Sequence, residues 1–92
     1  MKRFTDTDLF SDPWFRKLKP EAKLVWIYLC HRCDNSGVWD RDDDRLAFDT
    51  GIKGKLDSIL GLLGHRVEIL PSQKVLIPRF IKFQQRNKVL NP

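Results

Sequence analysis

Three groups of side chains in this sequence have residue types and spacing that suggest chemistry. Cys30-His31-Arg32-Cys33 places two thiols beside an imidazole, and carboxylates crowd residues 40–44. The third group is cationic, because residues 52–92 carry most of the excess of Lys and Arg over Asp and Glu. In that order, the groups suggest a metal or redox site, a magnesium site for phosphoryl chemistry, and a surface for a polyanion.

The cysteine pair is a poor candidate for a metal or redox centre. A structural zinc site needs four ligands, normally two such pairs, and this chain has only Cys30 and Cys33. His65 and Asp34 would complete a set only by coincidence of packing. Redox Cys-x-x-Cys motifs sit at a strand–helix junction, whereas this pair falls in a predicted helix. We expect buried helix cysteines, no metal and no cofactor.

The acidic run is also better explained by structure than by catalysis. Consecutive carboxylates before a helix commonly cap it and suit its positive end. No general base, phosphate-binding loop or glycine-rich cradle accompanies them, and a reaction needs a converging set of groups. We therefore expect that the protein is not an enzyme. The run comprises Asp40, Asp42, Asp43 and Asp44.

The basic charge is concentrated in the second half of the chain. The formal net charge is +5 and the pI is about 9.5. The acidic excess lies in residues 37–51, and the basic excess lies mainly in residues 52–92. A polyanion such as nucleic acid is the partner that this distribution favours, with a merely solvated basic face as the alternative.

The first elements follow from turn signals and apolar spacing. Residues 1–19 are predicted to form an arm in which Asp12-Pro13 begins a short helical turn. Pro20 suits the first position of a central, mostly buried helix, and residues 34–37 (Asp-Asn-Ser-Gly) should end it with a left-handed cap. Four apolar side chains of the arm should dock on the core: Phe10, Trp14, Phe15 and Leu18.

Two further elements should precede the most periodic segment. Residues 38–40 (Val-Trp-Asp) predict a very short strand, and an aspartate of the acidic run should cap a short helix over residues 45–49. A third helix is predicted over residues 52–64, because its apolar residues recur with a period near 3.6. These residues are Ile52, Leu56, Ile59, Leu60 and Leu63.

The chain should then form a β-hairpin. Residues 67–70 and 75–83 are rich in β-formers and are separated by the turn Pro-Ser-Gln-Lys. Pro78 must lie on an edge strand or near a strand end, since it has no N–H to donate. Residues 20–85 would then be one domain, with residues 86–92 beginning a linker.

This order of elements predicts an α+β fold of the winged helix-turn-helix type. Three helices would form the core, and the hairpin would be the wing beside the third helix. The short strand at residues 38–40 would pair with the hairpin in one small antiparallel sheet. Without this pairing, an isolated strand of three residues would have no structural explanation.

Several short motifs resemble one known family. The helix start Pro20-Glu21-Ala22-Lys23, the Asp-rich turn followed by Gly37-Val38, and the carboxy-terminal Phe80, Lys82, Gln84 and Leu90-Asn91-Pro92 are similar to the amino-terminal domain of bacteriophage replisome organisers. Related replication-initiation proteins include the DnaD-like primosome proteins. The similarity covers nearly the whole chain.

The resemblance implies a winged-helix module that binds origin DNA or self-associates in the cytoplasm of a bacterial cell. A helicase or helicase loader would be recruited by a further carboxy-terminal region, so we expect the chain to be one domain of a longer protein. Nothing in the sequence resembles a secretion signal or a membrane span.

The predicted DNA interface combines the exposed side of the third helix with cations of the hairpin and tail. A helix of this kind fits the major groove, whereas phosphate contacts position the protein. Asp57 opposes close contact, because phosphate repels a carboxylate. The alternative is a protein-interaction module anchored by Trp14, Trp39 or Leu62. The predicted reading residues are Lys53, Lys55, Ser58, Gly61 and His65, and the predicted phosphate contacts are Arg66, Lys74, Lys82, Arg86 and Lys88.

Overall fold

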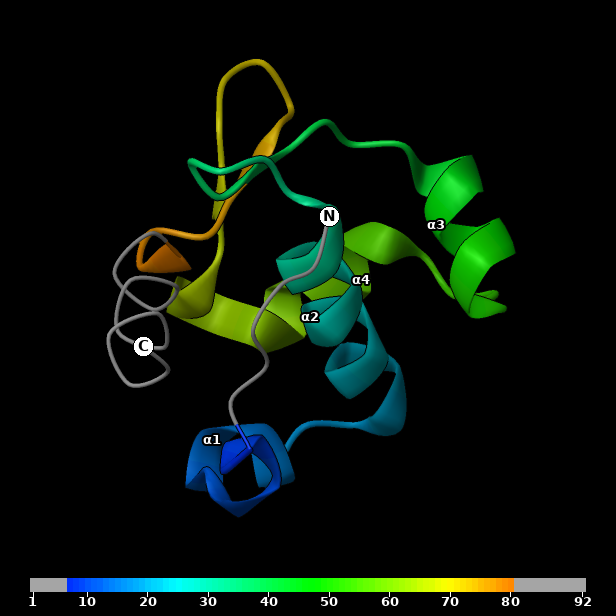
Figure 1. Cartoon of the computed structure of the whole chain (residues 1–92). Coiled ribbons are helices and arrows are strands. Elements are labelled where there is room, and N and C mark those ends of the chain that lie inside the picture. The colour runs from blue at the N-terminus through cyan, green and yellow to red at the C-terminus, as the bar shows by residue number, and fades with distance from the viewer. Residues whose placement is uncertain (1–6, 81–92) are drawn as a thin grey trace.

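The computed structural model describes residues 7–80. Over these residues the chain has four α-helices and a three-stranded antiparallel sheet, which confirms the α+β class (Figure 1). Short 3₁₀ turns precede α1 and follow α4. The elements are α1 (Pro13–Arg16), α2 (Pro20–Arg32), β1 (Val38–Trp39), α3 (Asp43–Thr50), α4 (Leu56–Leu63), β2 (Glu68–Ile69) and β3 (Val75–Leu76).

Helix α2 is the centre of the molecule and packs against both α3 and α4 (Figure 1). Pro20 occupies its first turn, as predicted. Ala22, Val25 and Leu29 are fully buried. Leu24 is apolar but exposed, because it lies on the side of the helix away from this stripe.

The end of α2 differs from the prediction. The helix stops at Arg32, and its cap residue Cys33 is extended and not left-handed. The Asp34 carboxylate accepts hydrogen bonds from the backbone N–H groups of Ser36 and Val38, at 2.8 and 3.0 Å. Residues 34–37 therefore form a turn that leads into β1, and the local hydrogen bonding of Asp34 replaces a helix cap.

Gly37 closes this turn where no side chain would fit. Its φ angle is +85°, and a Cβ atom there would lie 2.7 Å from the Ile77 carbonyl oxygen and 2.7 Å from Phe80 Cβ. The Ile77 N–H donates to the Gly37 carbonyl at 2.8 Å. The backbone geometry and the close approach both require glycine.

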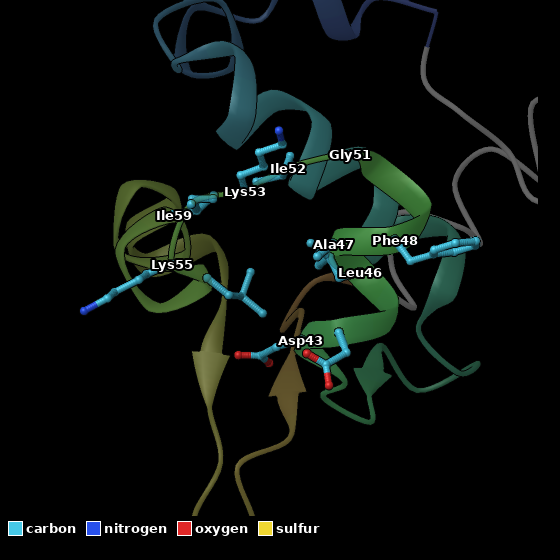
Figure 2. Close-up of a pocket in the computed structure, with 12 residues that line it drawn as sticks. Asp43, Leu46, Ala47, Phe48, Gly51, Ile52, Lys53, Lys55 and Ile59 are labelled. Atoms are coloured by element: carbon cyan, nitrogen blue, oxygen red, sulfur yellow. The ribbon is translucent and has the colours of Figure 1, made fainter.

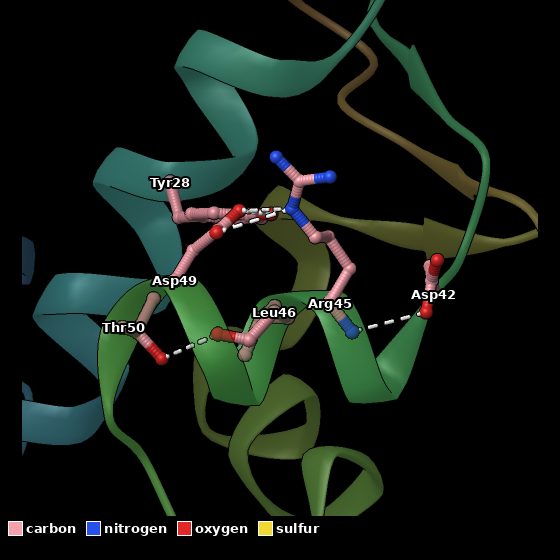
Figure 3. Close-up of polar contacts among 6 residues, drawn as sticks. All are labelled: Tyr28, Asp42, Arg45, Leu46, Asp49 and Thr50. Carbon is pink, nitrogen blue, oxygen red and sulfur yellow. Dashed lines mark hydrogen bonds and ion pairs between the residues drawn. The ribbon is translucent and has the colours of Figure 1, made fainter.

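Helix α3 begins with an aspartate cap, as the sequence predicts. The Asp42 carboxylate accepts from the Arg45 backbone N–H at 3.0 Å, and Gly51 ends the helix in the left-handed region with φ of +76° (Figure 3). A side-chain contact also ties α3 to α2. The Tyr28 hydroxyl donates to Asp49 at 2.7 Å, and Arg45 pairs with the same carboxylate (Figure 3).

Helix α4 is shorter than the predicted helix over residues 52–64. It begins at Leu56, so the prediction was wrong for residues 52–55, which form a turn. The left-handed Gly51 reverses the chain, and Gly54 adds about 1 kcal/mol to the cost of helix here. Ile52 is nevertheless buried, and its N–H donates to Thr50 Oγ1 at 3.2 Å. The predicted apolar stripe is buried throughout: Leu56, Ile59, Leu60 and Leu63.

The three strands pair in the order β1–β3–β2, which confirms that the short first strand joins the hairpin. Trp39 pairs with Val75, and Ile69 pairs with Val75 on the other side. Each strand has only two residues, so most of the described part of the predicted runs at 67–70 and 75–83 is not strand, and residues 81–83 lie outside the described residues. Pro78 lies beyond the end of β3, where a missing N–H costs no ladder bond.

The arm residues have unequal roles. Asp12 accepts from the Trp14 N–H at 2.9 Å and so begins α1 as predicted. Phe15 is buried, and Trp14 and Leu18 pack partly against the core. Phe10 was predicted to dock but is exposed, with one edge-to-face contact to Phe15.

Adjacent leucines on α4 provide a test of this packing. Leu63 is fully buried in the core cluster, whereas Leu62 is 44% exposed. We expect Leu63→Ala to lower the free energy of unfolding by about 2–5 kcal/mol, because it removes buried apolar surface and leaves a cavity. Leu62→Ala should change it by less than about 1 kcal/mol. Urea denaturation of both variants measures the difference, and equal losses would contradict the described orientation of α4.

Candidate nucleic-acid interface

The candidate interface is centred on the outward face of α4, which comprises Asp57, Ser58, Gly61 and Leu62. All four residues are exposed. The face exists because the other side of this two-turn helix is buried against the core. A helix that buries one apolar stripe must turn the opposite side chains to solvent or to a partner. The structure thus exposes two of the predicted reading residues, Ser58 and Gly61, together on one helix side.

Gly61 makes this face unusually flat. A Cβ atom built at Gly61 would meet nothing within 4 Å, and its φ angle is not positive. Neither crowding within the described residues nor backbone conformation therefore requires glycine there. Glycine inside a helix costs about 1 kcal/mol relative to alanine. The position leaves room for close approach of another molecule.

Lys53 and Lys55 are exposed as predicted, but they lie in the turn before α4 and not on the helix. Lys55 is the residue that precedes the first turn of α4. Figure 2 shows the two side chains pointing in different directions from this turn. The structure therefore places both amines near the start of α4 without bringing them together.

A groove runs between α3 and the start of α4 (Figure 2). Its volume is about 600 Å³, and Leu46, Ile52 and Ile59 contribute to its walls. Carboxylates of α3 and lysines of the turn line it as well. Phe48 also borders the groove, but its ring points away from it and is 85% exposed.

Arg41 was not among the predicted residues, yet its side chain contacts two carboxylates near the interface. Its Nε lies 2.8 Å from Asp43 Oδ1, and its terminal nitrogen lies 2.8 Å from Asp57 Oδ1. The Arg41 side chain is only 14% exposed, whereas that of Asp57 is 83% exposed. The sequence did contain a signal for this ion pair. Arg41 is the single cation within the acidic run at 40–44, so it is surrounded by potential carboxylate partners.

Hydrogen bonds lower the pKa values of two carboxyl groups on α3, those of Asp43 and Asp49. The hydrogen bond from Arg41 holds the pKa of the Asp43 carboxyl below its ordinary value of 3.8, and partial burial opposes this shift. On α3, the hydrogen bond from Tyr28 likewise lowers the pKa of Asp49. Burial raises the pKa of Tyr28, and the Asp49 hydrogen bond adds to this effect. These carboxylates are therefore charged groups with structural partners.

The remaining predicted contacts are distributed over the molecule. His65 is exposed in the 3₁₀ turn after α4. The guanidinium of Arg66 lies 4.3 Å from the centre of the Trp14 ring, so a cation–π contact holds it against α1. Lys74 pairs with Asp40 at 3.1 Å between the hairpin and β1. Three predicted residues lie outside the described residues: Lys82, Arg86 and Lys88.

The three residues predicted as anchors of a protein-interaction module differ in their exposure. Trp39 is buried, so it is not the exposed anchor that the sequence suggested. Trp14 is half-buried between Arg66 and the Trp26 ring, with which it makes an edge-to-face contact. Leu62 remains exposed on the outward face of α4.

The chain has no match among known protein families, curated proteins or solved structures. Within residues 7–80, no three or more His, Cys, Asp or Glu side chains gather where they could hold a metal ion. None of the helices described for this chain has the length and apolar character that crossing a membrane requires.

Gly61→Ala should raise the free energy of unfolding by about 1 kcal/mol, because alanine favours helix and the position is open. The control is Gly51→Ala, also at an open position but with φ of +76°. That variant should lose about 1–2 kcal/mol through backbone strain alone. Urea denaturation distinguishes them, and destabilisation by Gly61→Ala would mean that the face is covered.

Replacing Arg41 with Gln should raise the pKa of Asp43 towards 3.8, because its main hydrogen-bond donor is removed. In the native protein this carboxyl stabilises the fold fully above its ordinary pKa. That stabilisation is lost as the pH falls through the lowered pKa of the folded state. An NMR titration of the Asp43 carboxyl in both proteins measures the shift. An unchanged pKa in Arg41→Gln would contradict the described pair.

Proposed function

We propose that this chain is the DNA-binding module of a replication-initiation protein of the replisome-organiser type. In this proposal α3, residues 51–55 and α4 form a helix-turn-helix, and the β2–β3 hairpin is the wing. The outward face of α4 enters the major groove, which is about 12 Å wide and admits one helix. Ser58 then faces base edges, and Leu62 can contact a thymine methyl group.

The observation that carries the proposal is the open outward face of α4. It is exposed and flattened by Gly61, and lysines stand at its amino-terminal start. Lys53 and Lys55 form no ion pair with any residue in the range 7–80, so their charge is available to phosphate. Their different directions suit contacts with different phosphates better than one shared contact.

The net charge of +5 supports the same partner. Positive charge speeds encounter with DNA and supplies the sequence-independent part of binding. The Asp57 carboxylate would oppose this, but its ion pair with Arg41, which Asp43 shares, offsets part of its charge. The repulsion between this carboxylate and the duplex is therefore reduced.

A protein-interaction module is the second candidate, and the exposed ring of Phe48 favours it. An aromatic side chain that is 85% exposed on α3 is a suitable anchor for a protein partner. Such an interface would be mainly apolar, so its affinity should depend weakly on salt. DNA binding through phosphate contacts should weaken steeply with salt.

We expect Lys53→Ala/Lys55→Ala to weaken binding to duplex DNA. The slope of log K against log salt should fall by about 1 for each phosphate that the variant no longer neutralises. Fluorescence anisotropy of a labelled duplex at several salt concentrations measures both effects. The matched control is Arg16→Ala/Lys17→Ala, which removes the same charge from exposed positions at the end of α1 (Figure 1).

The control should keep most of the affinity and fold equally well. Equal losses of affinity in the two double variants would show that only net charge affects binding and that α4 is not the helix that contacts the DNA bases. The single variants then separate the two lysines, since their side chains diverge (Figure 2). Wild-type protein that binds no duplex even at low salt would refute the proposed function.

A further inference from the structure

We propose that Arg41 is a positioning residue for the DNA interface, which it serves by holding Asp57 at the start of α4 and offsetting part of its charge. The inference rests on the proposed function and adds a residue that lies outside the outward face of α4. Arg41 belongs to the segment between β1 and α3, yet its guanidinium reaches both helices of the proposed motif.

The geometry of Arg41 is that of a bridge. Two of its nitrogens bond the two oxygens of Asp43, at 2.8 and 3.1 Å, which is a fork-like contact. One of those nitrogens also lies 2.8 Å from Asp57. Asp43 is the first residue of α3, and Asp57 is in the first turn of α4. One planar cation therefore links the amino-terminal ends of the two helices.

The burial of its cation, and not of the Asp57 carboxylate, sets this ion pair apart from the others on the described surface. The Arg41 side chain is 14% exposed, whereas the Arg45 and Lys74 side chains are 58% and 48% exposed. A cation held among protein atoms loses less conformational freedom when DNA arrives, and salt screens it less than an exposed one. Arg41 can thus stay on Asp57 while the helix approaches a phosphate backbone.

The consequence for binding follows from the position of Asp57. Its carboxylate lies on the outward face and is 83% exposed, so an approaching phosphate would meet it. Arg41 also binds Asp43, so the pairing offsets part of the Asp57 charge and not all of it. Without Arg41, the Asp57 carboxylate would repel the duplex more strongly and its side chain would no longer be held by this contact. Arg41 therefore acts through Asp57 and need not touch DNA.

A double-mutant cycle tests this inference on the full 92-residue chain with a labelled duplex. We expect Arg41→Gln to weaken DNA binding about tenfold, within the range of coupling between neighbouring groups. In the Asp57→Asn background the same substitution should weaken binding less than about threefold, because residue 57 then carries no charge for Arg41 to offset. Thermal unfolding of each variant verifies that it is folded.

Arg45 and Asp49 supply the matched control cycle. They form an Arg–Asp ion pair at 3.0 Å on α3, and Arg45→Gln removes the same charge. We expect Arg45→Gln to have a similar small effect whether residue 49 is Asp or Asn. If the Arg41 cycle shows no more coupling than this control, charge alone explains the result and the inference is overturned.

Arg41→Lys separates geometry from charge and serves if Arg41→Gln does not fold. Lysine keeps the charge but has no planar fork to bridge two carboxylates. We expect it to bind DNA several-fold more weakly than wild type, and wild-type affinity would overturn the inference. Wild-type binding with an uncoupled Arg41 refutes this inference alone. Absence of wild-type binding to any duplex refutes the proposed function as well.

Discussion

The burial of one side of α4 against the core is the constraint on which the rest of the structure depends. Four apolar residues of this eight-residue helix are buried, so its rotation about its own axis is set by the core. Burying a leucine or isoleucine side chain contributes about 1.5–3 kcal/mol, which no surface contact near α4 matches. Ser58 and Gly61 are exposed as a consequence of this burial. The candidate interface is therefore positioned by hydrophobic packing, and its polar residues were free to be chosen for a partner.

The acidic residues between β1 and α4 serve mainly to hold the fold. Asp42 caps α3, Asp43 and Asp57 share Arg41, and Asp49 joins α3 to α2 through Tyr28. Each carboxylate is thereby offset by a helix end or by a neighbouring donor. Long-range attraction to DNA comes from the net basic charge of the whole chain, and these local partners explain how an acidic segment can lie beside a proposed DNA surface.

The sequence predicted those features that depend on local patterns. The apolar period of α4, the start of α2 at Pro20 and an aspartate cap on α3 are each encoded within a few residues, and the structure contains them, with Asp42 as the cap. The true start of α4 was not predicted, because the apolar period near 3.6 continues back to Ile52. That residue is buried, but it lies in the turn before the helix.

Long-range contacts could not be read in the same way. No local pattern indicates that Arg41 meets Asp57 or that Arg66 lies on Trp14, since both contacts join separate elements. The burial of Trp39 likewise depends on how the sheet packs and not on its neighbours in sequence. Of the candidate site, the exposed residues of α4 were predictable, whereas their electrostatic setting was not.

The tight turn at Gly37 has a mechanical consequence. Its carbonyl receives the Ile77 N–H, and Phe80 packs where a side chain at position 37 would be. A force applied to the chain after Phe80 would therefore act first on the Gly37–Ile77 hydrogen bond and on the two-residue strands, and only then on the helices. Tension from anything attached at that end would shear the sheet first, while the helical core and the face of α4 kept their shape.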